Sequence, residues 1–149
     1  MVNSPDESAL VTEFLDRFLG FEDGVISRIS IVLPRGDRGG RRIELEIQAL
    51  DRKAPAEEGP GGRLFGWKLV RIFMHGIEEY SLGETIEYPL QVLSDGLKIG
   101  FLGDRFLLDL DPGPDEWSSL AIQDLSTSYS KQYIVARGFS FEVADGPFI

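Results

Sequence analysis

Three aspartates form the sharpest cluster of chemically capable groups in this sequence. Asp109, Asp111 and Asp115 lie in the run LDLDPGPDE, directly after an apolar segment. Hard cations bind clustered carboxylate oxygens, so this spacing predicts a candidate metal site. The alternative is a strand end followed by an exposed turn. That alternative is favoured because Pro114 stands where a calcium-binding EF-hand loop requires glycine.

His75 is the only histidine of the chain and its candidate catalytic residue. A histidine can serve as a general base when a partner group lies within hydrogen-bonding distance. A cleft that joined His75 to nearby carboxylates would make the chain a small-molecule binder or a hydrolase. The sequence, however, contains no nucleophile elbow, phosphate-binding loop or dinucleotide fingerprint. We therefore predict no catalytic residue and no cofactor, and keep the enzyme as the alternative hypothesis.

An acidic surface is the feature that favours a non-catalytic role. The formal net charge of the chain is −10 at pH 7. Such a surface attracts a basic protein partner and speeds the association of the two. The same charge argues against nucleic-acid binding, which needs a basic face. The carboxylates predicted to contact a partner are Glu78, Glu79, Glu84 and Glu87.

One segment of opposite charge interrupts this acidic sequence. The run PRGDRGGRR lies between two apolar segments and contains Arg35, Arg38, Arg41 and Arg42. A solvated turn is the favoured interpretation, because short charge clusters usually keep a loop in water. An anion-binding tip is the functional alternative.

The composition predicts one soluble, cytoplasmic domain over residues 1–149. A chain of 149 residues can bury a core of its own. It has no cysteine, which excludes disulfides and fits a reducing compartment. The N-terminus lacks the basic region of a secretory signal, and no apolar run approaches the roughly 18 residues of a membrane span. We therefore predict no membrane association.

The spacing of apolar residues predicts one helix. Residues 4–20 begin with a capping box, Ser4 to Glu7, and continue as a broad apolar stripe. Such a stripe must pack on another element, so the helix is expected to lie on a sheet. Residues 51–63, by contrast, read DRKAPAEEGPGGR. A segment so rich in glycine, proline and charge predicts a flexible loop.

Alternation with a period of two predicts strands through the rest of the chain. The expected elements are a hairpin of residues 25–33 and 41–50, a central strand at 64–82, a three-stranded meander within 86–112 and a last strand at 133–144. The central strand is apolar on both faces between Val70 and Met74, and Gly76 allows it to bend. In the last strand, Tyr133 and Val135 are expected to share a face with Phe139.

These elements predict a mainly β fold. It is expected to be an antiparallel two-layer β-sandwich or a strongly curved sheet of about eight strands, with the N-terminal helix packed on it. An open strand edge would also allow a homo-oligomer, because unpaired backbone groups on such an edge can pair with a second copy.

Three motifs carry a resemblance to a known group of proteins: Gly20-Phe21-Glu22-Asp23, IFMHGIEE at residues 72–79 and LLDLD at residues 107–111. In the order of these motifs the chain resembles small bacterial all-β proteins of unknown function, some of which stand beside toxin genes as immunity proteins. That group more often has Phe-His-Asp in the first motif, so Glu22 departs from it. The resemblance implies a non-enzymatic β protein and supplies no catalytic residue. We therefore predict a non-catalytic protein-interaction module, with toxin neutralisation as its most specific form.

Overall fold

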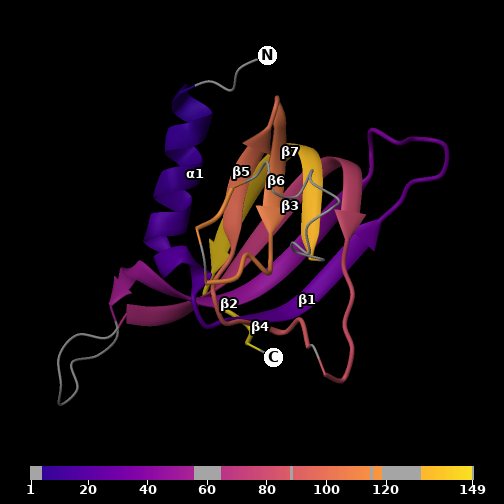
Figure 1. Cartoon of the computed structure of the whole chain (residues 1–149). Helices are drawn as coiled ribbons and strands as arrows, with labels where there is room; N and C mark the ends of the chain where they lie inside the picture. The colour runs from indigo at the N-terminus through magenta and orange to yellow at the C-terminus, as the bar shows by residue number, and fades with distance from the viewer. Residues whose placement is uncertain (1–4, 56–64, 88, 115, 119–131, 149) are drawn as a thin grey trace.

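The computed structural model describes residues 5–55, 65–87, 89–114, 116–118 and 132–148, and this part of the chain forms one antiparallel sheet and one α-helix (Figure 1). The elements are α1 (Pro5–Arg17), the short 3-10 helix η1 (Leu19–Phe21), β1 (Gly24–Val32), β2 (Arg42–Pro55), β3 (Phe65–Ser81), β4 (Val92–Leu93), β5 (Lys98–Leu102), β6 (Arg105–Asp109) and β7 (Tyr133–Ala144). Strands account for 53% of the described residues, which confirms the predicted mainly β fold.

The sheet is strongly curved, as the connection between its two edges requires. Its strand order is β4-β1-β2-β3-β7-β6-β5. β4 and β5 are therefore opposite edges, yet only residues 94–97 separate them in the chain. Five residue steps reach at most about 18 Å, whereas the edges of a flat sheet with this order would lie about 29 Å apart. The sheet curls into a half-barrel, which confirms the curved sheet rather than the sandwich.

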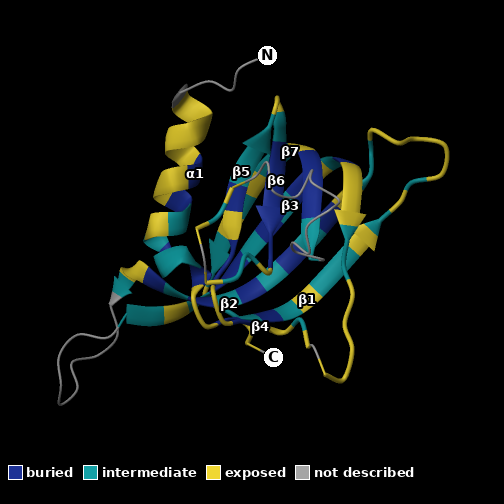
Figure 2. Ribbon diagram, in the orientation of Figure 1, coloured by how far each residue is buried: buried dark blue, intermediate teal, exposed yellow. Residues whose placement is uncertain are grey.

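The concave side of the half-barrel, which we call the inner face, holds the hydrophobic core. Along β2, buried residues alternate with half-buried ones, so a single face of the strand points inward (Figure 2). The fully buried neighbours across β2 and β3 are Ile43 with Met74, Leu45 with Ile72, and Ile47 with Val70. β1 and β2 form the predicted hairpin, and β3 is the predicted central strand.

The helix α1 packs on the inner face through phenylalanine rings. Phe14 is 2% exposed, and its ring centroid lies 4.3 Å from that of Phe141 and 5.2 Å from that of Phe139 on β7. Phe18 and Phe21 complete this aromatic cluster from the chain that follows the helix. The helix ends at Arg17, three residues before the predicted Gly20, because the backbone there turns to positive φ through η1.

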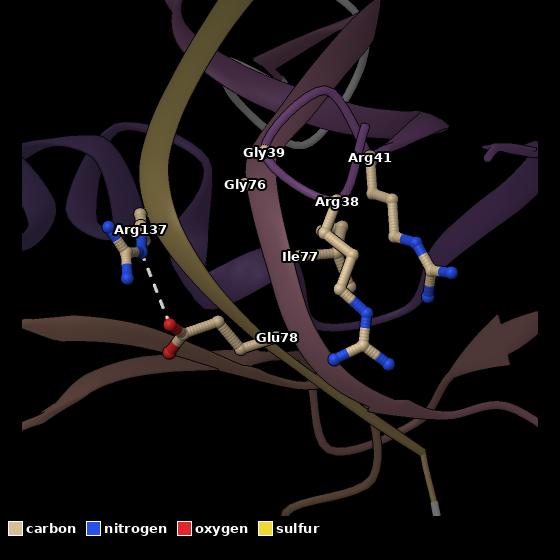
Figure 3. A pocket seen from close by; sticks show the side chains of 7 residues that line it. All are labelled: Arg38, Gly39, Arg41, Gly76, Ile77, Glu78 and Arg137. Atoms are coloured by element: carbon tan, nitrogen blue, oxygen red, sulfur yellow. Dashed lines mark hydrogen bonds and ion pairs between the residues drawn. The ribbon is translucent and has the colours of Figure 1, made fainter. Parts of the chain in front are cut away.

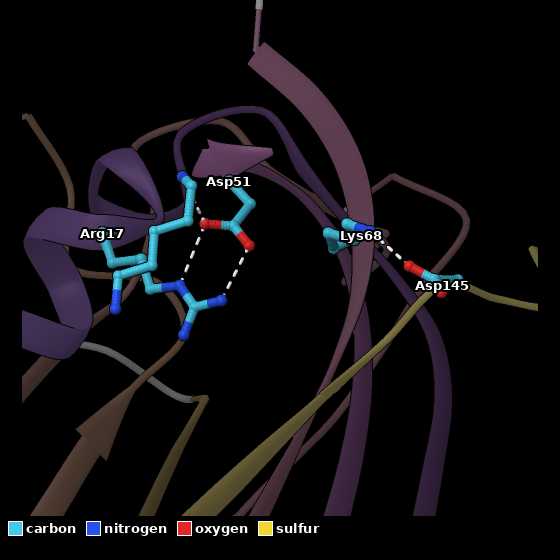
Figure 4. A network of polar contacts seen from close by, with 5 residues as sticks. Arg17, Asp51, Lys68 and Asp145 are labelled. Carbon is cyan, nitrogen blue, oxygen red and sulfur yellow. Dashed lines mark hydrogen bonds and ion pairs between the residues drawn. The ribbon is translucent and has the colours of Figure 1, made fainter. Parts of the chain in front are cut away.

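A half-buried ion pair links the helix to the C-terminal end of β2 (Figure 4). Arg17 donates from Nε and Nη2 to the two carboxylate oxygens of Asp51, both at 2.9 Å. Burial alone would raise the pKa of Asp51, but the Arg17 hydrogen bond, the Lys53 N–H and the charges of Arg17 and Lys68 together lower it.

The predicted loop at 51–63 is wrong at its start, because Asp51–Pro55 continue β2. The remainder of that loop falls on residues 56–63, which lie outside the described residues.

The predicted three-stranded meander is correct only in its second half. β5 and β6 form a hairpin around Gly103 and Asp104, as expected. The first predicted strand is reduced to Val92–Leu93, which pairs with β1 at the opposite edge of the sheet. Pro89 explains the difference, because proline lacks the N–H that a strand donates to its neighbour.

Two predictions about side-chain direction were wrong for physical reasons. Around Arg71 and Phe73, β3 is half-buried rather than apolar on both faces, because the outer face of the sheet meets solvent there. On β7, Ile134 and Ala136 point into the core, whereas Phe139 packs against it from the next odd position. The alternation therefore switches between Ala136 and Phe139, so Val135 does not share the face of Phe139.

Candidate functional site

Three of the four predicted contact carboxylates already have partners within the chain. Glu78 accepts hydrogen bonds from Arg105 and Arg137, and Glu79 accepts one from Tyr133. Glu84 accepts the backbone N–H of Leu90 at 3.0 Å. The fourth, Glu87, is exposed on the loop between β3 and β4. These residues line different parts of the surface, and their role in partner binding stays a prediction.

The predicted metal ligands are not brought together as a set of free carboxylates. Asp109 is 2% exposed, and its oxygens accept hydrogen bonds from the backbone N–H of Asp111 and from Trp117 Nε1, both at 2.9 Å. Asp111 points to solvent, and Asp115 lies outside the described residues. Asp109 thus holds the segment that follows β6. Within the part of the chain that the structure describes, no three metal-binding side chains cluster.

His75 is exposed on the outer face and lines neither of the two cavities described below. Its Nε2 lies 3.1 Å from the Oγ of Ser140, and its ring stacks on Phe73 with centroids 6.2 Å apart. A serine beside a histidine is the start of a nucleophilic site, but catalysis also needs a group that orients the histidine and a place for the substrate. Among the described residues, no carboxylate lies within ion-pair distance of His75 to orient its ring.

A β-bulge in β3 shapes the end of the sheet beside the β1–β2 loop. The carbonyl of Arg41 accepts hydrogen bonds from Gly76 N–H at 3.0 Å and from Ile77 N–H at 3.2 Å. Two consecutive donors on one acceptor define a bulge, and the φ of +64° at Gly76 suits glycine in its first position. The bend confirms the one predicted at Gly76. It leaves Ile77 buried and Glu78 exposed.

Next to this bulge lies a cavity of about 490 Å³, which we call the arginine pocket (Figure 3). Its lining residues are Arg38, Gly39, Arg41, Gly76, Ile77, Glu78 and Arg137. The β1–β2 loop, β3 and β7 all contribute, so residues far apart in the sequence meet here. Figure 3 shows the side chains of Arg38 and Arg41 extending from the loop in the same direction, while Glu78 turns toward Arg137.

The arginines of this pocket differ in how their charge is balanced. Among the described residues, no carboxylate lies within ion-pair distance of Arg38 or Arg41, and the buried Nε of Arg41 has no hydrogen-bond partner. The arginines that do form ion pairs are Arg17, Arg42, Arg71, Arg105 and Arg137. Two guanidinium groups without an ion pair, that of the exposed Arg38 and that of the half-buried Arg41, therefore line one cavity.

Glu78 supplies the carboxylate of the lining. Its Oε1 accepts a hydrogen bond from Arg137 Nε at 3.2 Å, and its Oε2 accepts one from Arg105 Nε. The Arg105 hydrogen bond, and then that of Arg137, lower the pKa of Glu78 even though burial opposes the shift. Glu78 is thus held in its charged form. Three guanidinium groups and one carboxylate leave the lining with a net formal charge of +2.

A second cavity, of about 220 Å³, lies on the outer face and shows the opposite arrangement. Its floor is a row of cross-strand neighbours, Arg28, Glu46, Arg71 and Glu142, from β1, β2, β3 and β7. Arg71 donates to Glu46 and to Glu142, each at 3.1 Å. The charge at the centre of this row is balanced internally, which identifies a stabilising ladder rather than a site.

The open edge of β1 bears on the predicted homo-oligomer. β4 pairs with Gly24 and Val25, and the Ile26 N–H donates to the Gln91 carbonyl at 2.8 Å, so β1 beyond Ile26 has, among the described strands, a partner on the β2 side alone. Ile31 on this stretch is 41% exposed. An open edge of this kind permits pairing with another chain, and the oligomer stays a prediction.

Comparison of the chain with protein-family models, with characterised proteins and with solved structures gave no match. In the described part of the chain, no helix combines the length and the apolar character needed to cross a membrane. The resemblance to immunity proteins stays a prediction, and function is argued below from the pocket itself.

The sequence pointed to part of this site. It named an anion-binding tip made of Arg35, Arg38, Arg41 and Arg42 as the alternative to a solvated turn, and two of these four, Arg38 and Arg41, line the pocket. It missed Ile77, Glu78 and Arg137 as pocket residues, because they reach the loop only through the pairing of β2, β3 and β7. Gly76 is the residue in the sequence that indicates this site, because a glycine directly after an apolar strand is typical of a bulge.

Proposed function

We propose that this chain is a non-catalytic binding module whose arginine pocket holds an anionic group of a ligand or of a protein partner. The observation that carries the proposal is the unbalanced charge of Arg38 and Arg41 in one cavity. A buried donor without an acceptor typically costs about 1–3 kcal/mol. An oxyanion bound between the two guanidinium groups would remove that cost.

The chemistry of the lining supports binding rather than turnover. Guanidinium groups stay charged at every physiological pH and bind phosphate or carboxylate through paired N–H donors. Such groups hold an anion but do not transfer protons. Glu78 is kept as a carboxylate by Arg105 and Arg137, which makes it a poor proton donor. His75 does not line the pocket.

The proposal is tested by calorimetric titration of inorganic phosphate at constant ionic strength. The wild-type chain is expected to bind phosphate in a one-to-one complex. Arg38→Gln with Arg41→Gln should weaken binding at least about tenfold, the scale of losing charge-assisted hydrogen bonds. Arg28→Gln is the matched control, because Arg28 is an exposed arginine outside the pocket. No binding by the wild type, or equal binding by the double variant, would contradict the proposal.

A second candidate function is the predicted acidic interaction surface, with toxin neutralisation as its most specific form. The observation that favours it is the loop between β3 and β4, where Ile86 is fully exposed between exposed Glu84 and Glu87. An exposed apolar side chain with two exposed carboxylates on the same loop suits a basic partner with an apolar centre.

This second candidate is tested by affinity capture from the native host. A specific basic partner should be retained by the wild-type chain at low salt, and retention should fall when Glu84→Lys and Glu87→Lys reverse the loop charge. Asp6→Lys with Glu13→Lys is the control, because it reverses two exposed charges on α1 instead. Retention that the loop variant leaves unchanged would remove the acidic loop from consideration.

A further inference from the structure

We propose that the arginine pocket selects a phosphate monoester dianion, and that Glu78 competes with this ligand for Arg137. The inference rests on the proposed function of the pocket. It adds the charge and shape of the anion, and it names the residue of the chain that sets the affinity.

The unbalanced charge of the pocket defines the charge of its ligand. Arg38 and Arg41 each carry one positive charge without a counter-ion among the described residues. A carboxylate has one charge and two oxygens, which suit a single guanidinium fork. A phosphate monoester carries about −1.5 to −2 charges at pH 7 and keeps three acceptor oxygens. It can therefore engage both arginines at once.

The size and the remaining lining of the pocket suit an ester rather than a bare ion. A volume of about 490 Å³ falls within the range of small-molecule sites. Gly39, Gly76 and Ile77 line it without adding charge. These residues offer backbone and apolar surface for the group that carries the phosphate, while the two arginines hold the phosphate oxygens.

Glu78 is placed to compete with the ligand. It lies in the lining beside Arg137, whose Nε donates to it at 3.2 Å. The Arg137 side chain is 68% exposed, so its ion pair is screened by water and weak enough to exchange. Glu78 keeps a second partner in Arg105. A bound dianion can therefore draw Arg137 away from Glu78 and leave the carboxylate paired with Arg105 (Figure 3).

The ligand class is tested by calorimetric titration of three probes into the full chain at pH 7.5 and constant ionic strength: phenyl phosphate, benzoate and inorganic phosphate. Phenyl phosphate and benzoate share the ring and differ in the anion. Phenyl phosphate is expected to bind about tenfold more tightly than benzoate, because it engages a second guanidinium group. It should also bind more tightly than inorganic phosphate, which lacks the ester group.

The role of Glu78 is tested in the same titration with two variants of opposite expected effect. Glu78→Gln releases Arg137 and should tighten phenyl phosphate binding about three- to fivefold, the scale of one exposed ion pair. Arg105→Gln leaves Glu78 with Arg137 as its remaining partner in the pocket. Glu78 then holds Arg137 more firmly against the ligand, so phenyl phosphate binding should weaken by a similar factor. The matched controls are Glu87→Gln and Arg28→Gln, which change the net charge equally but lie outside the pocket.

The outcomes separate this inference from the proposed function. A wild-type chain that binds none of the three probes contradicts the proposed function itself. Equal binding of phenyl phosphate and benzoate would overturn the claim that the pocket selects a dianion. Inorganic phosphate that binds as tightly as phenyl phosphate would overturn the claim that the pocket prefers an ester. Glu78→Gln binding no more tightly than Glu87→Gln overturns the competition. In the last three outcomes the anion site remains.

Discussion

The two ends of β2 use arginine in opposite ways. At the far end, Arg17 reaches from α1 to the buried Asp51, and its charge is matched by two hydrogen bonds of 2.9 Å. At the near end, Arg38 and Arg41 lie beside the bulge without a carboxylate partner in the described chain. One end balances its charge internally, whereas the other presents its charge to a cavity.

This difference separates stability from function. Arg38 is exposed and Arg41 is half-buried, so water solvates most of their charge, but the Nε of Arg41 is buried without a hydrogen-bond partner among the described residues. Such a donor weakens a fold, because it loses water and gains nothing in return. An arrangement that a stability argument cannot explain is a reason to look for a ligand. The comparison therefore predicts that changes at the helix-covered end lower stability, while replacing Arg38 and Arg41 weakens binding without lowering stability.

The largest expected effect is at the aromatic cluster. Phe14→Ala should lower the free energy of unfolding by about 3–5 kcal/mol, the usual range for a buried phenylalanine. Phe14 is 2% exposed and contacts four other phenylalanine rings. Urea denaturation checks the value, with Leu10→Ala, an exposed position of the same helix, as control. A loss below about 1 kcal/mol would mean that Phe14 does not hold the helix on the sheet.

The next effect concerns the ion pair at the far end of β2. Asp51→Asn should cost about 1.5–3 kcal/mol, as expected for hydrogen bonds to a charged group. The pKa of Asp51 is lower in the folded chain than in the unfolded one, so its contribution is complete above about pH 4 and disappears as the pH falls through the folded pKa.

Unfolding curves between pH 7 and pH 2 test this pH dependence. The gap between the wild-type chain and Asp51→Asn should close as the solution becomes acidic. Asp145→Asn is the control, because it removes a carboxylate whose side chain is 92% exposed in its ion pair with Lys68. A gap that stays constant with pH would show that Asp51 is not stabilised through its charge.

A smaller effect is expected at the bulge, where one substitution should change both stability and phosphate binding. Gly76→Ala should cost about 1–2 kcal/mol, because a residue with a Cβ is strained at positive φ. The added Cβ would also lie 3.2 Å from the Arg137 Cβ, so phosphate binding should weaken. Gly103→Ala is the matched control, since Gly103 has the same φ sign but open space around it. If Gly76→Ala and Gly103→Ala affected phosphate binding equally, the bulge at Gly76 would not shape the phosphate site.

The smallest expected loss of stability is at the pocket itself. Arg38→Gln with Arg41→Gln should not lower the free energy of unfolding in the absence of phosphate, and can raise it by up to about 1–3 kcal/mol, because the variant removes the buried, unpartnered Nε of Arg41. The wild-type chain alone should then gain stability when phosphate is added, because a ligand of the folded state shifts the unfolding equilibrium. Thermal denaturation with and without phosphate measures both quantities. A double variant that gains as much as the wild type would contradict the account.

The sequence predicts those parts of the molecule that depend on local pattern. The hairpin of β1 and β2, the strand β7 and the apolar stripe of α1 all follow from periodicity, because each repeats over a single segment. The strand expected at Ile86 failed where Pro89 breaks the ladder, and the direction of Val135 failed where β7 shifts its alternation. The first failure arises from a single residue that overrides a longer pattern.

The arginine pocket depends on information that local pattern does not contain. Its loop arginines are visible in the sequence, but their cavity exists because the Arg41 carbonyl pairs with the bulge at Gly76. Glu78 and Arg137 join the lining through the pairing of β3 with β7. Only the register of three strands shows that Arg105 and Arg137 are neutralised while Arg38 and Arg41 are not.

The most direct test of this account is the NMR signal of the Arg41 Nε–Hε group during a titration with phenyl phosphate at constant ionic strength. This group is buried and has no hydrogen-bond partner among the described residues. We expect its signal to move with saturation, as a new acceptor binds, while the Nε–Hε signals of Arg17 and Arg71 stay in place because carboxylates already accept them. An Arg41 signal that does not move, or that moves only as much as those of Arg17 and Arg71, would contradict an anion site in the arginine pocket.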